Sequence, residues 1–216
     1  MNEQTFSDPQ RYVIKNWLAS RKLELAMEKI RKSYTEVGER IVAEIQERHK
    51  ELDYCKAFLT QNWDSGTIYI GRKAWVDNKE YFPTGYVLEN LRLDYLTDDT
   101  QPQPTLSIWL NKPEKKKVDK STAINVIANA AQKLLTPAEL KMCRLRPTKD
   151  SAIEYSLPET KSQLLDMLIT DNSQTFVDSI LTHFEVIAKF SSIIDGVYQS
   201  NNKESTMART KATLKT

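Results

Sequence analysis

The sequence predicts an α+β fold in which a long amino-terminal amphipathic helix precedes a sheet of about five strands, antiparallel or mixed, packed by carboxyl-terminal helices. Three observations predict it. Apolar residues repeat every three or four positions from residue 23 to 52, alternate with polar residues in short runs between 67 and 157, and return to the helical period after 172. We expect a helical segment at 1–62, an α+β domain at 63–198 and a flexible basic tail at 199–216.

The composition is that of a folded protein without a strong charge bias. Hydrophobic residues make up 40% of the 216 residues and charged residues 28%. The 31 basic and 29 acidic residues give a formal charge of +2, which does not by itself indicate nucleic-acid binding. No apolar run approaches the roughly 20 residues that cross a bilayer, and the polar start lacks a signal-peptide core. We therefore expect a cytoplasmic protein with no membrane partner.

A long helix is predicted near the amino terminus. Asp8 suits the capping position and Pro9 the first helical position, so the helix is expected to begin there. Further along, acid-before-base pairs such as Glu28 and Lys32 mark a solvated face. The opposite face is an apolar stripe formed by Leu23, Met27, Ile30, Tyr34, Val37, Ile41, Ile45 and Leu52.

This stripe requires a surface to pack against, because helical ion pairs contribute only about 0.2 to 0.5 kcal/mol each. The surface belongs either to this chain or to another one, and the sequence leaves both alternatives open. We predict an interface for self-association or for a protein partner at Met27, Ile30, Tyr34, Val37 and Ile41.

Alternating apolar and polar residues predict the strands. The runs are residues 67–75, 87–95, 106–110, 142–146 and 152–157. Two prolines and two aspartates in 97–104 predict a loop between the second and third runs.

Capping signals predict the carboxyl-terminal helices. Their expected starts are Asp119 or Ser121, Thr136, Ser156 with Glu159, and Asn172 or Ser173. In the last helix the inward-facing residues are expected to be Phe176, Ile180, Phe184, Ile187 and Ile194.

A lysine-rich segment precedes the first of these helices. Phosphate groups favour both lysines and the free amides of a helix amino terminus, so the segment is a candidate for binding nucleic acid or another polyanion. A solvated loop is the alternative. The candidate binding residues are Lys112, Lys115, Lys116, Lys117, Lys120, Arg144 and Arg146.

The sequence contains no recognisable catalytic or cofactor motif. The chain has two histidines, His49 and His183, and two cysteines far apart, Cys55 and Cys143, with none of the paired spacing of a zinc site. Two Glu-x-Lys tripeptides, at 114–116 and 159–161, lack the strand context of a metal-dependent nuclease. The aspartates at 94, 98 and 99 lack calcium-loop spacing. We predict no catalytic residues, metal or cofactor.

Two limited resemblances do not identify a family. Residues 208–213 resemble the start of the histone-three tail, but Ala208 follows Met207 inside the chain, whereas readers of that tail use its free terminal amine. The order helix, sheet, helix is similar to non-catalytic regions of some bacterial phage-defence nucleases, without a shared motif.

These patterns favour a non-catalytic interaction or regulatory subunit of an intracellular assembly. The alternatives are an accessory nucleic-acid-binding protein that uses the lysine-rich segment and, more distantly, a divergent metal-dependent nuclease.

Overall fold

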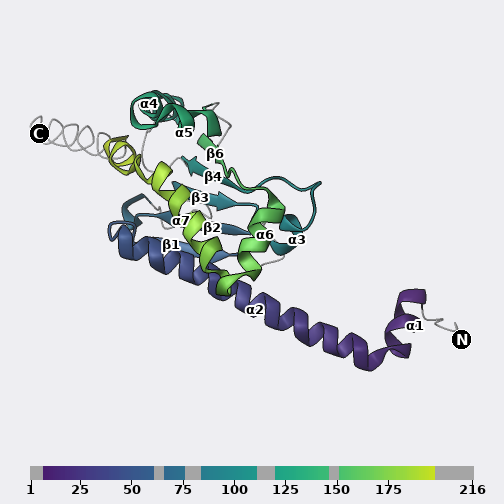
Figure 1. Ribbon diagram of the computed structural model, residues 1–216. Coiled ribbons are helices and arrows are strands. Elements are labelled where there is room, and N and C mark those ends of the chain that lie inside the picture. The colour runs from purple at the N-terminus through teal and green to yellow at the C-terminus, as the bar shows by residue number, and fades with distance from the viewer. Residues whose placement is uncertain (1–6, 61–65, 76–83, 111–119, 146–150, 198–216) are drawn as a thin grey trace, which may run out of the picture.

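The computed structural model describes residues 7–60, 66–75, 84–110, 120–145 and 151–197 (Figure 1). The chain begins with helix α1 (Asp8–Lys15), which the side chains of Ser7 and Gln10 cap reciprocally. A break at Asn16 separates α1 from α2 (Trp17–Arg48), a helix of 32 residues and therefore about 48 Å long. The expected amino-terminal helix is thus present, interrupted once.

Six antiparallel strands form one sheet in the order β1-β2-β3-β4-β6-β5. Their bounds are β1 Tyr54–Phe58, β2 Thr67–Gly71, β3 Gly85–Glu89, β4 Thr105–Trp109, β5 Cys143–Arg144 and β6 Ser151–Ser156. Together with the helices, this sheet confirms the α+β class.

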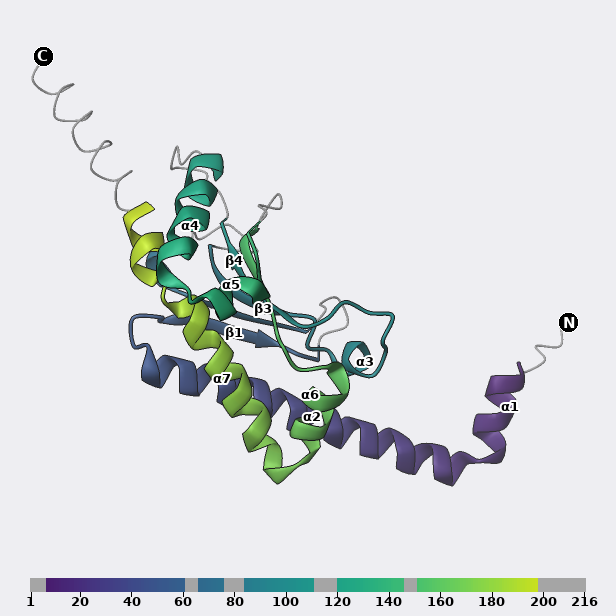
Figure 2. The same cartoon turned by 45° about the horizontal axis from the view of Figure 1, so that its top comes forward.

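The helices complete the body of the protein. Their bounds are α3 Leu93–Leu96, α4 Lys120–Leu134, α5 Pro137–Met142, α6 Lys161–Ile169 and α7 Gln174–Ala188, with short 3₁₀ turns η1 at Lys73–Trp75 and η2 at Asp171–Ser173 and further helical residues at 191–197. Helices α2 and α7 pack against the sheet and against each other, α6 packs on α7, and α4 packs beside β6 (Figures 1 and 2).

One face of the sheet forms the core with these helices. Directly opposed residues of an antiparallel sheet share a face, and Ile70, Tyr86, Ile108 and Ile153 form such a row across four strands. All four side chains are fully buried. The Tyr86 ring meets the Phe184 ring of α7 edge-on, with 5.5 Å between the ring centroids.

Two glycines permit close approaches on which this arrangement depends. A Cβ at Gly38 of α2 would lie 2.8 Å from Leu59, so this glycine brings the helix close to the end of β1. Gly66 has a φ of +83°, and a Cβ there would lie 2.1 Å from the backbone nitrogen of Arg92.

Several predicted boundaries differ from the structure. The helical segment expected to reach residue 62 ends at Arg48, and residues 54–58 instead pair with β2 as an edge strand. The second strand ends at Glu89, because Asn90 adopts a φ of +64° and residues 93–96 form α3. The third carboxyl-terminal helix begins at Lys161, capped by Thr160 and Gln163. The tail at 199–216 lies outside the described residues.

Candidate partner-binding surface

The amino-terminal arm, which we define as residues 7–33, projects from the body of the protein (Figure 1). Every residue in it is exposed except Ser20, which is half-buried. Nine of the eleven large hydrophobic side chains that are exposed among the described residues lie in this arm. They are Tyr12, Val13, Ile14, Trp17, Leu18, Leu23, Leu25, Met27 and Ile30. Exposed apolar residues concentrated in this way are typical of an interaction site.

The apolar stripe of α2 continues from the body into the arm without a break in spacing. Its carboxyl-terminal part, Tyr34, Val37 and Ile41, is buried against the sheet of the same chain. Its amino-terminal part continues on the same helical face through Met27 and Ile30, which are 46% and 54% exposed. The predicted interface therefore divides into three residues buried within this chain and two that remain accessible.

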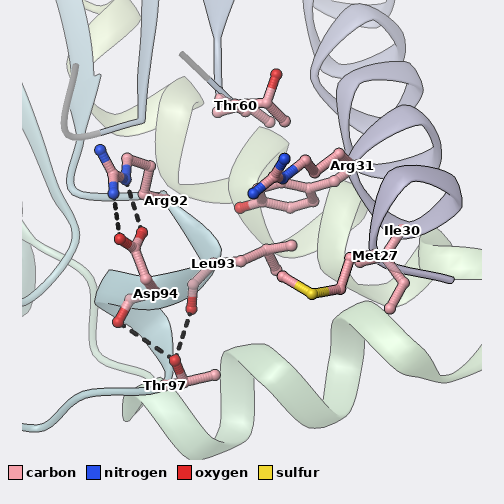
Figure 3. Close-up of a pocket in the computed structure, with 10 residues that line it drawn as sticks. Met27, Ile30, Arg31, Thr60, Arg92, Leu93, Asp94 and Thr97 are labelled. Atoms are coloured by element: carbon pink, nitrogen blue, oxygen red, sulfur yellow. Dashed lines mark hydrogen bonds and ion pairs between the residues drawn. The ribbon is translucent and has the colours of Figure 1, made fainter. Parts of the chain in front are cut away.

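A pocket of about 330 Å³ lies where the arm leaves the body. Helix α2 contributes Met27, Ile30, Arg31 and Tyr34 to this junction pocket. The body contributes Leu59, Thr60, Arg92, Leu93, Asp94 and Thr97. Figure 3 shows Met27 and Arg31 extending from α2 toward Leu93 and Arg92. Its volume is at the lower end of the range for ligand sites, enough for one large side chain of a partner.

Hydrogen bonds fix the body side of the junction pocket. Arg92 donates to both carboxylate oxygens of Asp94, one of them at 2.6 Å, and these bonds hold the pKa of Asp94 below its usual value. Thr97 donates its hydroxyl to the Leu93 carbonyl at 3.0 Å. The Tyr34 hydroxyl donates to the Leu91 carbonyl, and burial raises the pKa of this phenol. This wall is therefore preformed.

Arg31 differs from Arg92 in having no such balancing charge. It forms no ion pair with any other residue in the described part of the chain. The junction pocket thus combines apolar walls with one uncompensated guanidinium, a donor group suited to a carboxylate.

The predicted basic residues lie mostly outside the described structure. Lys112, Lys115, Lys116, Lys117 and Arg146 fall outside the described ranges, and Lys120 is the first residue of α4. Arg144 is exposed on β5. The lysine-rich segment remains a prediction.

One histidine belongs to a polar network that the sequence analysis did not find. His183 of α7 contacts Glu159 at 2.9 Å through Nε2 and the Tyr155 hydroxyl at 3.1 Å through Nδ1. Ser179, one helical turn before His183, donates to the same Glu159 oxygen at 2.8 Å. The four-residue spacing of Ser179 and His183 is the only local signal for this network.

The geometry of this network indicates a structural role and is not that of an activated serine nucleophile. The hydroxyl of Ser179 is directed at the carboxylate and not at the imidazole, so the histidine does not activate it. Burial raises the pKa of Tyr155, and it raises the pKa values of the Cys55 and Cys143 thiols to about 11. The network ties β6 to α7.

A second network joins three segments on the other side of α7. Arg72 pairs with Asp195, whose other oxygen accepts a hydrogen bond from the Trp75 indole at 2.9 Å. His49, at the end of α2, lies 3.1 Å from Glu185 of α7. These contacts hold η1, α2 and the last helices together.

Asp98 and the lysine of one Glu-x-Lys tripeptide are engaged locally. Asp98 accepts hydrogen bonds from Thr100 and Gln101, which lower its pKa. Lys161 is 6% exposed and donates to two backbone carbonyls at 2.6 Å each, so the Glu-x-Lys at 159–161 has its lysine occupied. Within the ranges described, no group of three potential ligands is placed to hold a metal ion.

Comparisons with protein-family models, curated proteins and solved structures give no match for this chain. Among the helices in the described parts, none is both long and apolar enough to cross a bilayer.

Proposed function

We propose that this protein is a non-catalytic interaction subunit whose amino-terminal arm binds a helical segment of a protein partner. The observation that supports the proposal is the concentration of nine exposed hydrophobic side chains in an arm that no other described part of the chain covers. Leu23, Met27 and Ile30 share one face of α2 within this set, and such a group of uncovered apolar side chains costs solubility unless it is buried in an assembly. Helix-in-groove and helix-on-helix packing are the recurring ways to bury such a stripe.

The division of the stripe supports the same conclusion. Tyr34, Val37 and Ile41 anchor α2 on the sheet, so the helix has no need of Met27 and Ile30 for its own attachment. These two residues nevertheless keep the apolar character and spacing of the anchored half. The exposed apolar character of Met27 and Ile30 is explained if a second surface packs on them.

The experiment compares Ile30→Asp with Leu25→Asp, which introduces the same charge at an exposed apolar position on the opposite face of α2. The purified proteins are analysed by light scattering for self-association, and the native protein is copurified with its partners while the absorbance ratio reports bound nucleic acid. We expect Ile30→Asp alone to lose the partner protein, with circular dichroism unchanged. Equal partner retention by both variants would overturn the proposal.

Copurification also tests the nucleic-acid alternative. Bound nucleic acid that is released by salt would favour the lysine-rich segment as the functional element, because phosphate contacts weaken as salt rises.

A further inference from the structure

The charge of the arm restricts what can bind to its apolar stripe. Residues 7–33 contain seven basic and three acidic residues, a formal charge of +4, whereas the whole chain carries +2. The remainder of the chain therefore carries −2. The excess of positive charge is located on the same element as the exposed apolar side chains.

The basic residues lie beside the stripe, where they would flank a bound helix. With 100° of rotation per residue, Arg31 borders the stripe on one side, and Lys22 and Lys29 lie toward the other side. Glu24, the acidic residue nearest the stripe, is already paired with Arg21 at 2.6 Å. The flanks of the stripe thus present net positive charge to an incoming segment.

Resting on the function proposed above, we infer that the occupant of the stripe is an acidic amphipathic helix of a different protein, which inserts an apolar side chain into the junction pocket and places a carboxylate against Arg31. The pocket offers Met27, Ile30 and Leu93 as apolar contacts and the Arg31 guanidinium beside them. Arg92 is balanced by Asp94, so Arg31 is the pocket's uncompensated charge.

A second copy of this chain is a poorer occupant on electrostatic grounds. Pairing two arms would bring together two segments of +4 each, and like charges along a helical interface oppose association. An acidic partner converts the same charges into attraction, which also accelerates encounter.

An anionic membrane would satisfy the charge but not the shape. A helix lying on a membrane has one apolar face and an opposite polar face. Here Leu18 and Leu25, seven residues apart, are exposed on the face opposite Met27 and Ile30, among the lysines. The junction pocket, moreover, is walled on one side by the body, which a flat surface cannot enter.

The test uses two defined probes, because the natural partner is unidentified. Both are fluorescein-labelled peptides of three heptads with leucine at the first and fourth positions. One carries glutamate at the two positions that flank the leucines, and the other carries lysine there. Fluorescence anisotropy of the full chain measures their affinity at low and high salt. The variants are Arg31→Glu, its matched control Lys32→Glu, and Ile30→Asp.

We expect the acidic peptide to bind at least about tenfold more tightly than the basic one at low salt. Arg31→Glu should weaken the acidic peptide about fivefold more than Lys32→Glu does, because Lys32 carries the same charge outside the pocket. Ile30→Asp should abolish binding of the acidic peptide. This pattern supports the inference.

Four results would overturn it. If both peptides bind equally well and Ile30→Asp binds neither, the arm binds helices, but the preference for an acidic partner is rejected. A dimer that Ile30→Asp dissociates, without peptide binding, would make a second copy the occupant. Sedimentation with phosphatidylserine vesicles, again without peptide binding, would make the arm a membrane anchor. Equal losses of affinity in Arg31→Glu and Lys32→Glu would show that general electrostatic attraction, and not a contact in the pocket, binds the acidic peptide.

Discussion

Two isoleucines on the same face of α2 should respond in opposite ways to truncation. Ile41 is fully buried in the core, whereas Ile30 is 54% exposed in the arm. Ile41→Ala removes three buried carbon atoms and leaves a cavity, which lowers the free energy of unfolding by about 2 to 5 kcal/mol. Ile30→Ala removes side-chain atoms already in contact with water, so the change stays within about 0.5 kcal/mol. Because alanine favours a helix more than isoleucine does, that small change is expected to be stabilising.

Urea denaturation followed by circular dichroism measures both effects. With a denaturant slope of about 2 kcal/mol per molar urea, Ile41→Ala should lower the midpoint by roughly 1 to 2.5 M, and Ile30→Ala should raise it by no more than about 0.25 M. Ile41→Val, expected to cost about 0.5 to 1.5 kcal/mol, keeps the comparison measurable if the alanine variant does not fold.

The reasoning fails if Ile30→Ala destabilises the isolated protein as much as Ile41→Ala does. The arm would then be packed on the chain's own body in solution, and the stripe would not be available to a partner. Repeating the titration at two protein concentrations separates this result from self-association, which makes the midpoint depend on concentration.

The polar elements give three further expectations. Burial raises the pKa of Glu159, but hydrogen bonds from His183 and Ser179 outweigh it and leave the pKa below its usual value. The ionised Glu159 therefore stabilises the fold above about pH 4.5, and this contribution is lost as the pH falls through the lowered pKa. The difference in urea midpoint between the native protein and Glu159→Gln should accordingly shrink below that pH, and a constant difference contradicts it. Alanine at all three lysines of 115–117 should weaken polyanion binding and flatten its salt dependence in a filter-binding assay, whereas unchanged values indicate a solvated loop. The purified protein should hydrolyse neither nucleic acid nor simple esters, with or without magnesium or zinc. Metal-dependent cleavage abolished by Asp94→Ala, or by alanine at Glu154, a carboxylate of β6, would restore the nuclease alternative.

Sequence periodicity predicts the larger elements of this fold because their burial repeats at a fixed interval. Phe176, Ile180 and Phe184 recur at the helical spacing and are all buried in α7. β1 escaped prediction because the apolar spacing of α2 extends past its last turn to Leu52, and five residues carry too little pattern to reveal pairing with β2. The second strand is shorter than predicted because Asn90 has a positive φ, which the alternation of apolar and polar residues does not predict.

The candidate site was predictable only as a stripe. Met27 and Tyr34 obey one spacing, so nothing local distinguishes the residue that faces a partner from the one that faces the sheet. The distinction depends on where the body ends, which is fixed by Leu59 and Leu93, distant in sequence from the helix. The Glu159 network escaped for the same reason: its acid and its imidazole are 24 residues apart and meet only through the packing of β6 on α7.

The continuity of α2 also explains how residues 17–33, none of which is buried, are presented as a helix. The first turn of an isolated helix is costly to form, whereas adding residues to an existing helix is not. The half of α2 anchored by Ile41 and Ile45 supplies that first turn, and residues 17–33 extend it. A partner therefore meets a preformed apolar face and has less conformational entropy to remove on binding. This stabilisation by extension of the anchored helix stops at Asn16, where the helix breaks. Helix α1 is a separate segment with no buried residue of its own.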